Sequence, residues 1–133
     1  MTLEEARAIF ANDSFATQAA GIRIDSCGLH TARCSMKITS AHLNAMGKVM
    51  GGAIYTLADY TFAVAANSEG LQWVSAQSSV NFLSAAAEGI LSAEASCEHE
   101  GRNTCLYTIK ISDGNNKQIA IVSAVGVRVA GNQ

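Results

Sequence analysis

The sequence predicts an α+β fold in which an antiparallel sheet of five or six strands wraps around one long buried helix. The helix is expected at 53–67, a stretch that is apolar on nearly every helical face and carries a single charge, Asp59. Four segments of strand character follow it, separated by short links of small and turn-forming residues. Tight links between consecutive strands favour an antiparallel meander that curls around the helix.

The other elements are expected from local patterns. Thr2 and Glu5 have the spacing of a capping box, which predicts a short flanking helix over 2–10. Alternation of polar and apolar residues predicts a strand at 28–38, followed by a loop up to Gly52. The strands after the buried helix are expected at 73–83, 89–98, 104–112 and 118–129.

Length and composition indicate one domain, 1–133, that associates with copies of itself. A chain of 133 residues buries a core without disulfides or metals. Hydrophobic residues make up 49% of the chain and charged residues only 15%, more apolar surface than a monomer of this size hides easily. The net charge of -2, without a block of Lys or Arg, argues against a nucleic-acid or polybasic membrane surface.

The absence of several sequence motifs excludes further classes of protein. Glu4 and Glu5 are acidic where a signal peptide needs basic residues, and no apolar run is long enough to cross a bilayer, so we expect a cytoplasmic protein. The four cysteines form no C-x-x-C pair and the three histidines are scattered, so neither a metal site nor a cofactor is expected. The absence of G-x-S-x-G disfavours a Ser-His-Asp hydrolase.

Asp59 is the candidate catalytic residue, because burying a lone carboxylate costs several kcal/mol and requires a partner or a function. A structural pairing with an Arg or a backbone group is the alternative explanation. Gly51 and Gly52 at the helix entrance favour catalysis, since free N–H groups at a helix N-terminus stabilise a developing oxyanion. Asn44 and Gly47 lie in the same loop, where Asn44 could add a polar side chain.

The spacing of these residues carries an inference about assembly. Asp59 follows Gly51 by eight positions, about 12 Å along a helix that rises about 1.5 Å per residue. One reacting carbon cannot lie about 3 Å from both groups of one chain. If both act on one substrate, the N–H of Gly51 comes from one subunit and Asp59 from its neighbour across a two-fold axis.

Residues 42–59, HLNAMGKVMGGAIYTLAD, resemble the H-L-N-x-x-G-x-x-H-G-G-x-x-x-x-L-A-D signature of hotdog acyl-CoA thioesterases of the phenylacetate-degradation type. The likeness extends over about 40–129, including the helix exit at 65–71 and the strand residues 80–83. The resemblance implies a hotdog fold and hydrolysis of a small or medium acyl-CoA to free acid and CoA. It also implies homodimers that pair into tetramers.

The resemblance assigns roles to individual residues. Asp59 corresponds to the family's catalytic carboxylate, which acts as general base or nucleophile. Gly51 corresponds to the residue whose backbone N–H polarises the thioester carbonyl. Asn44 falls on a residue that positions substrate or water. The chain departs from the signature at Met50, which replaces a His and cannot donate a hydrogen bond or a proton. We therefore expect Met50 to line the acyl pocket and to alter rate or substrate preference.

Further substrate contacts and two other functions complete the expectations. Gly47 and Gly52 are expected to line the substrate site, and Lys48, Arg102 and Arg128 are the candidate contacts for the CoA phosphates. A hotdog hydroxyacyl dehydratase is a second possible function, which Met50 disfavours because that chemistry needs a His beside the acid. A non-catalytic acyl-CoA-binding protein, in which Asp59 is structural, is the third.

Overall fold

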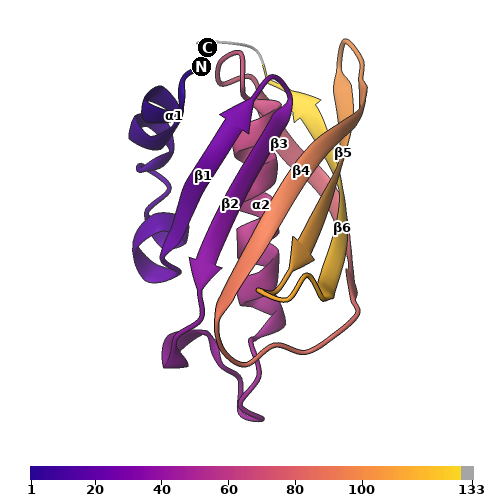
Figure 1. Ribbon diagram of the computed structural model, residues 1–133. Helices are drawn as coiled ribbons and strands as arrows, with labels where there is room; N and C mark the ends of the chain where they lie inside the picture. The colour runs from indigo at the N-terminus through magenta and orange to yellow at the C-terminus, as the bar shows by residue number, and fades with distance from the viewer. Residues whose placement is uncertain (130–133) are drawn as a thin grey trace.

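The computed structural model describes residues 1–129, in which a six-stranded antiparallel sheet curves around one long helix (Figure 1). The helices are α1 (Leu3–Phe10) and α2 (Gly51–Ala66), with a π-helical turn at Phe15–Ala19 and a 3-10 turn at Ser40–His42. The strands are β1 (Ile22–Gly28), β2 (Thr31–Lys37), β3 (Trp73–Phe82), β4 (Ile90–Glu100), β5 (Thr104–Ser112) and β6 (Gln118–Arg128).

The strand order is β1-β2-β4-β5-β6-β3, so the predicted meander is right for β4, β5 and β6 and wrong for β3. β3 pairs with β6 at the edge of the sheet, and segment 83–89 carries the chain past the start of α2 to β4 (Figure 1). This crossing leaves β4 free to pair with β2. Alternation of polar and apolar residues indicates where strands lie but not which strands pair. In the observed strand order, all six strands contact α2.

β1 is the strand that the sequence pattern did not resolve. The predicted strand at 28–38 runs through a hairpin turn at 29–30, and β2 begins only at Thr31. His30 has a φ of 57° in this turn, a conformation that hairpins usually assign to Gly or Asn. His is not a typical turn residue, so the sequence alone gives no indication of a turn at 29–30. The predicted strand therefore included these two residues.

α2 begins at Gly51, two residues before the prediction, and packs an apolar face against the sheet. Leu57, Ala58 and Phe62 are almost completely buried. The Phe62 ring meets Tyr107 of β5 edge to face, with centroids 5.5 Å apart. Gly52, Thr56, Asp59 and Ala63 recur every three or four residues and are less buried, so Asp59 lies on the least covered face of the helix.

The N-terminal segment packs beside β1 and reaches α2. The capping box of α1 is confirmed, since Glu5 N–H donates to Thr2 Oγ1 at 3.1 Å and Thr2 N–H donates to Glu5 Oε1 at 2.8 Å. α1 contacts β1, and the π-helical turn that follows contacts both β1 and α2. Among residues 1–129, no helix has both the length and the hydropathy of a membrane span.

Candidate active site

Asp59 opens into a cavity of about 370 Å³ between α2 and the segment that precedes β1. The cavity is lined by Asp13, Ser14, Phe15, Ala16, Tyr55, Thr56, Asp59, Tyr60 and Ala63. Within the described part of the chain, no Lys or Arg forms an ion pair with Asp59. A structural pairing with Arg is therefore not what holds this carboxylate in place.

Burial raises the pKa of Asp59 above the ordinary carboxyl value of 3.8. The charge of Asp13 raises it further, since two like charges oppose ionisation, whereas a hydrogen bond from the Ser75 hydroxyl lowers it. Ser75 stands where β3 shifts register against β6, and such bulges re-aim side chains near active sites. A raised pKa suits a general base, because it moves the base toward neutral operating pH.

The start of α2 leaves two backbone N–H groups, those of Gly51 and Gly52, without a hydrogen-bond acceptor among residues 1–129. Met50 is the N-cap and its side chain makes no capping hydrogen bond. A groove of about 430 Å³ lies beside Gly51, lined by Asn44, Lys48, Val49, Gly51, Ile54, Phe82, Leu83, Ser84 and Ala85. The structure thus brings three predicted site residues together: Asn44, Lys48 and Gly51.

The loop before α2 is held by its own hydrogen bonds. Asn44 Oδ1 accepts the N–H groups of Met46 at 2.9 Å and Lys48 at 3.1 Å, so its side-chain oxygen closes the turn. Gly47 has a φ of +75°, which only glycine adopts without strain, so it shapes the turn. His42 Nε2 lies 2.7 Å from Ala20 O and its own carbonyl accepts the Met50 N–H, which fixes the start of the helix.

Met50 and Gly52 border a second, more apolar cavity of about 490 Å³. Its lining comprises Phe15, Ala19, Ala20, Ala41, His42, Met50, Gly52, Ala53 and Thr56. Phe15 and Thr56 also line the Asp59 cavity, so apolar surface continues from the start of α2 toward the carboxylate. Met50 is 56% exposed here, a position from which its thioether can contact an acyl chain.

Gly51 and Asp59 do not converge within one chain. Gly51 borders the groove and Asp59 the cavity beside the N-terminal segment, and the two depressions share no residue. Helix geometry places them about 12 Å apart along α2. Within one chain, the Gly51 N–H and the Asp59 carboxylate therefore border different depressions.

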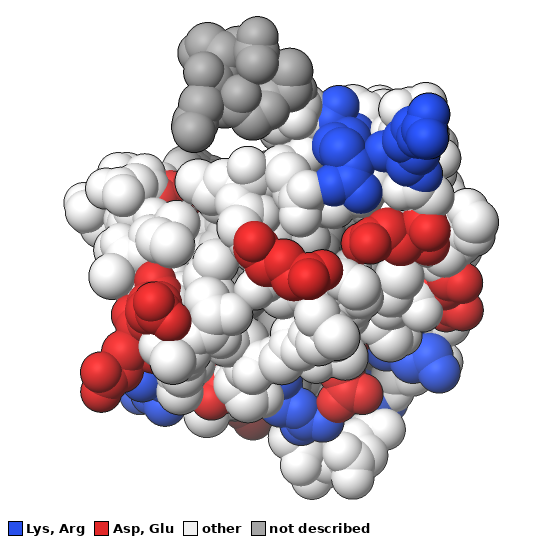
Figure 2. Space-filling model, turned by 90° about the horizontal axis from the view of Figure 1, so that it is seen from above, with Lys and Arg blue, Asp and Glu red and all other residues white. Residues whose placement is uncertain are grey.

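Arg102 and Arg128 lie at the end of the molecule opposite Lys48. Arg128 Nε donates to Arg102 O at 2.7 Å, its guanidinium bonds Gln72 beyond the exit of α2, and it stacks 4.2 Å above the Trp73 ring. Figure 2 looks onto this end and shows basic side chains beside acidic ones. The three predicted phosphate contacts thus form no single patch within one chain.

Sequence reasoning missed Asp13 and Ser75. Both lie outside the 42–59 segment, and an isolated Asp or Ser carries no local signal of function. Only the fold, by packing the N-terminal segment and β3 next to α2, places them near Asp59.

Comparisons with known proteins show which proteins this chain is similar to. Residues 46–120 match the family "Thioesterase superfamily". The chain is 34% identical over 129 residues to acyl-coenzyme A thioesterase PaaI of Escherichia coli, covering 96% of this chain and 91% of that protein. It is 36% identical over 99 residues to a putative esterase of Archaeoglobus fulgidus, covering 74% of this chain and 64% of that one.

Solved structures give the same result. The E. coli PaaI structure superposes with a TM-score of 0.86 at 30% identity, over 98% of both chains. A hypothetical thioesterase of Streptococcus pneumoniae, solved with coenzyme A, superposes with a TM-score of 0.84 at 24% identity, over 91% of this chain and 97% of that one. The hotdog fold expected from the sequence is confirmed.

Proposed function

Because the chain belongs to the thioesterase superfamily, we propose that it hydrolyses a small or medium acyl-CoA with Asp59 as base or nucleophile and Gly51 N–H as oxyanion donor. The chain is an acyl-CoA thioesterase by its relationship to PaaI. The observation that carries the residue assignment is the half-buried Asp59 carboxylate, which has no cationic partner among residues 1–129 and opens into a cavity.

The proposed chemistry needs only these two groups. The Gly51 N–H polarises the thioester carbonyl, with the positive end of the α2 dipole behind it. As general base, Asp59 takes a proton from water while the water oxygen attacks the carbonyl carbon. The tetrahedral intermediate then expels the CoA thiolate, which recovers the proton. As nucleophile, Asp59 would attack the same carbon and expel the CoA thiolate, leaving an acyl anhydride; water then hydrolyses the anhydride to the free acid and the Asp59 carboxylate, and the thiolate takes up the proton that water releases.

The proposed enzyme is a homo-oligomer with a site shared between subunits. Support comes from the separation of Gly51 and Asp59 and from β3, whose outer edge has no partner strand in the described sheet. A two-fold axis across α2 would bring Asp59 of one chain to the partner's Gly51. The same axis would bring Arg102 and Arg128 of one chain toward the Lys48 end of the other, where they could contact one CoA. Pairing of such dimers would give a tetramer.

Hydrolysis of a panel of short, medium and aromatic acyl-CoAs, followed with a thiol-reactive dye, tests the function. Asp59→Asn should lower kcat at least about 100-fold, since general bases contribute about 10²–10⁴-fold. Glu98→Gln is the matched control, because Glu98 is exposed on β4. If Asp59→Asn keeps more than about a tenth of wild-type turnover, Asp59 is not the main catalytic group. Binding of acyl-CoA without release of thiol would identify a non-catalytic binding protein.

A further inference from the structure

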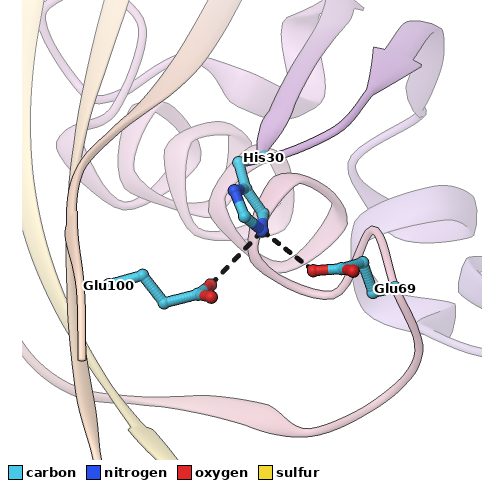
Figure 3. Close-up of side chains that lie close together, drawn as sticks. All are labelled: His30, Glu69 and Glu100. Carbon is cyan, nitrogen blue, oxygen red and sulfur yellow. Dashed lines mark hydrogen bonds and ion pairs between the residues drawn. The ribbon is translucent and has the colours of Figure 1, made fainter. Parts of the chain in front are cut away.

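Three potential metal ligands from separate parts of the chain converge at the end of the molecule where α2 finishes (Figure 3). His30 comes from the β1–β2 turn, Glu69 from the loop after α2, and Glu100 from the end of β4. His30 Nε2 lies 3.1 Å from Glu69 Oε1 and 3.4 Å from Glu100 Oε1. One ligand atom of each residue lies within 4.8 Å of the other two.

No Lys or Arg side chain among residues 1–129 offsets the two carboxylates of this cluster, since none forms an ion pair with Glu69 or Glu100. The N-terminal ammonium lies nearby, where it donates to Ser68 O at 2.8 Å. His30 Nε2 carries at most one proton, shared between two carboxylates, and even a charged imidazole leaves a net negative charge. A divalent cation in contact with all three groups would neutralise the cluster.

The two distances around His30 Nε2 are compatible with zinc. Zinc bonds of about 2.0–2.1 Å at tetrahedral angles place neighbouring ligand atoms about 3.3 Å apart. The separations of 3.1 and 3.4 Å around His30 Nε2 bracket that value. An imidazole nitrogen also selects zinc over calcium and magnesium, which prefer oxygen ligands throughout. We propose that His30, Glu69 and Glu100 bind Zn²⁺, with water in the fourth position.

The turn that carries His30 is already held in the required place. The His30 N–H donates to Ser68 Oγ at 2.9 Å, which ties the β1–β2 turn to the residue before Glu69. The backbone that carries His30 is thereby held beside the residue before Glu69 before any metal binds, which lowers the ordering cost of binding.

The position of the cluster assigns zinc a structural role. Glu69 lies beyond the C-terminal end of α2, ten residues after Asp59, whereas Gly51 lies at the other end of the helix. A bound ion would join the β1–β2 turn, the α2 exit and the end of β4. It should therefore stabilise the fold.

Calorimetric titration of the EDTA-treated, dialysed protein with Zn²⁺ tests the proposal, together with thermal unfolding. One zinc per chain is expected, and zinc at about 100 times the Kd should raise the Tm by roughly 5–10 °C. His30→Ala and Glu100→Gln should lower zinc affinity at least about tenfold, the lower end of what changes around metal ligands cause. Zinc competes with a proton for His30, so affinity should fall in acid.

The matched controls are His99→Ala and Glu98→Gln, which remove exposed residues of the same types from β4. Both should bind zinc as the wild type does. Glu69→Gln changes an exposed side chain, so its fold should persist, and its Tm without metal should equal that of wild type. Absence of saturable zinc binding, or equal loss in the His99 and His30 variants, would overturn the proposal. Either result would leave the assignment of Asp59 untouched.

Discussion

Asp13 and Asp59 line the same cavity, one from the segment before the π-helical turn and the other from the middle of α2. Burial is the main cause of the raised pKa of Asp59, and the charge of Asp13 adds to it. The Ser75 hydroxyl on β3 acts in the opposite direction. The pKa of the proposed base thus depends on two residues that lie outside α2 in the sequence.

Asp13→Asn and Ser75→Ala should shift the pH profile of hydrolysis in opposite directions. A general base works when deprotonated, so activity is lost as pH falls through the pKa of Asp59. Removing the Asp13 charge lowers that pKa and moves the acid limb of kcat/KM to lower pH. Removing the Ser75 hydroxyl raises the pKa and moves the limb to higher pH. Profiles of the two variants and wild type from pH 4 to 9 check this.

A control for these profiles is Glu4→Gln, which removes an exposed acid of α1 that is not among the causes of the Asp59 shift. Its profile should coincide with that of wild type. Parallel shifts in the Asp13 and Ser75 variants would show that neither acts through the Asp59 carboxylate.

Asp59→Asn should make the protein more resistant to heat at neutral pH. The folded-state pKa of Asp59 lies above its ordinary value, so the folded protein holds this proton more tightly than the unfolded chain. That stabilisation is complete below the ordinary pKa of 3.8 and is lost as pH rises through the folded pKa. Asn does not ionise, so the variant does not lose this stabilisation as pH rises. The difference in Tm between the variant and wild type should therefore be more positive at pH 7 than at pH 4. A constant difference would contradict the assignment.

Much of the candidate site could be proposed from the sequence because its signals are local. The buried helix, its single charge at Asp59 and the glycines at its entrance lie within one continuous stretch of sequence. Periodicity and helix geometry alone sufficed to place Gly51 and Asp59 about 12 Å apart. The structure keeps both residues on α2 and opens them to separate depressions.

What was missed depends on contacts between distant segments. The pairing of β3 with β6 and the position of Ser75 follow from the crossing at 83–89, which local alternation does not encode. His30 and Glu69 are 39 residues apart, so no motif of closely spaced ligands relates them in the sequence. Arg128 illustrates the same limit, since its contacts with Trp73 and Gln72 exist only in the folded sheet.

Gly126→Ala should destabilise the fold. A Cβ at Gly126 would lie 2.7 Å from Cys105 Sγ and 2.9 Å from Phe62 Cζ, so the packing of α2 on β6 must shift. Overpacking of this kind costs about 1–3 kcal/mol of unfolding free energy. Gly114→Ala is the control, because a Cβ there meets nothing within 4 Å. Urea unfolding of both variants measures the difference, and equal midpoints would contradict the packing described for Gly126.

Met50→His should be tolerated by the fold and should change the substrate profile. Met50 is exposed at the rim of the apolar cavity, and its side chain makes no capping hydrogen bond. An imidazole there adds a proton donor beside the Gly51 N–H and reduces apolar contact with an acyl chain. Turnover of short, medium and aromatic acyl-CoAs by both proteins provides the comparison. Coincident profiles would show that residue 50 only packs.

Mixed dimers test whether the site is shared. In a shared site, a dimer of Asp59→Asn with Gly51→Val contains one site with both defects and one with neither. Gly51→Val is expected to disturb the donor, since even a Cβ there lies 3.1 Å from the Phe82 ring. Co-expression should therefore recover activity that neither variant shows alone. Two-fold symmetry predicts about half of wild-type activity in pure heterodimers and about a quarter after random mixing, when half the dimers are mixed.

A site contained within one chain predicts no recovery, because every chain carries one defect. Differently tagged subunits allow the mixed dimers to be isolated, and circular dichroism establishes that both variants are folded. Mixing Asp59→Asn with Glu98→Gln serves as the control, because each such dimer keeps one intact pair of Gly51 and Asp59 under either arrangement. Inactivity of isolated, folded heterodimers of the two defective variants would exclude the shared site. It would also require Asp59 and Gly51 to act on substrate separately, which about 12 Å of helix makes incompatible with one reacting carbon.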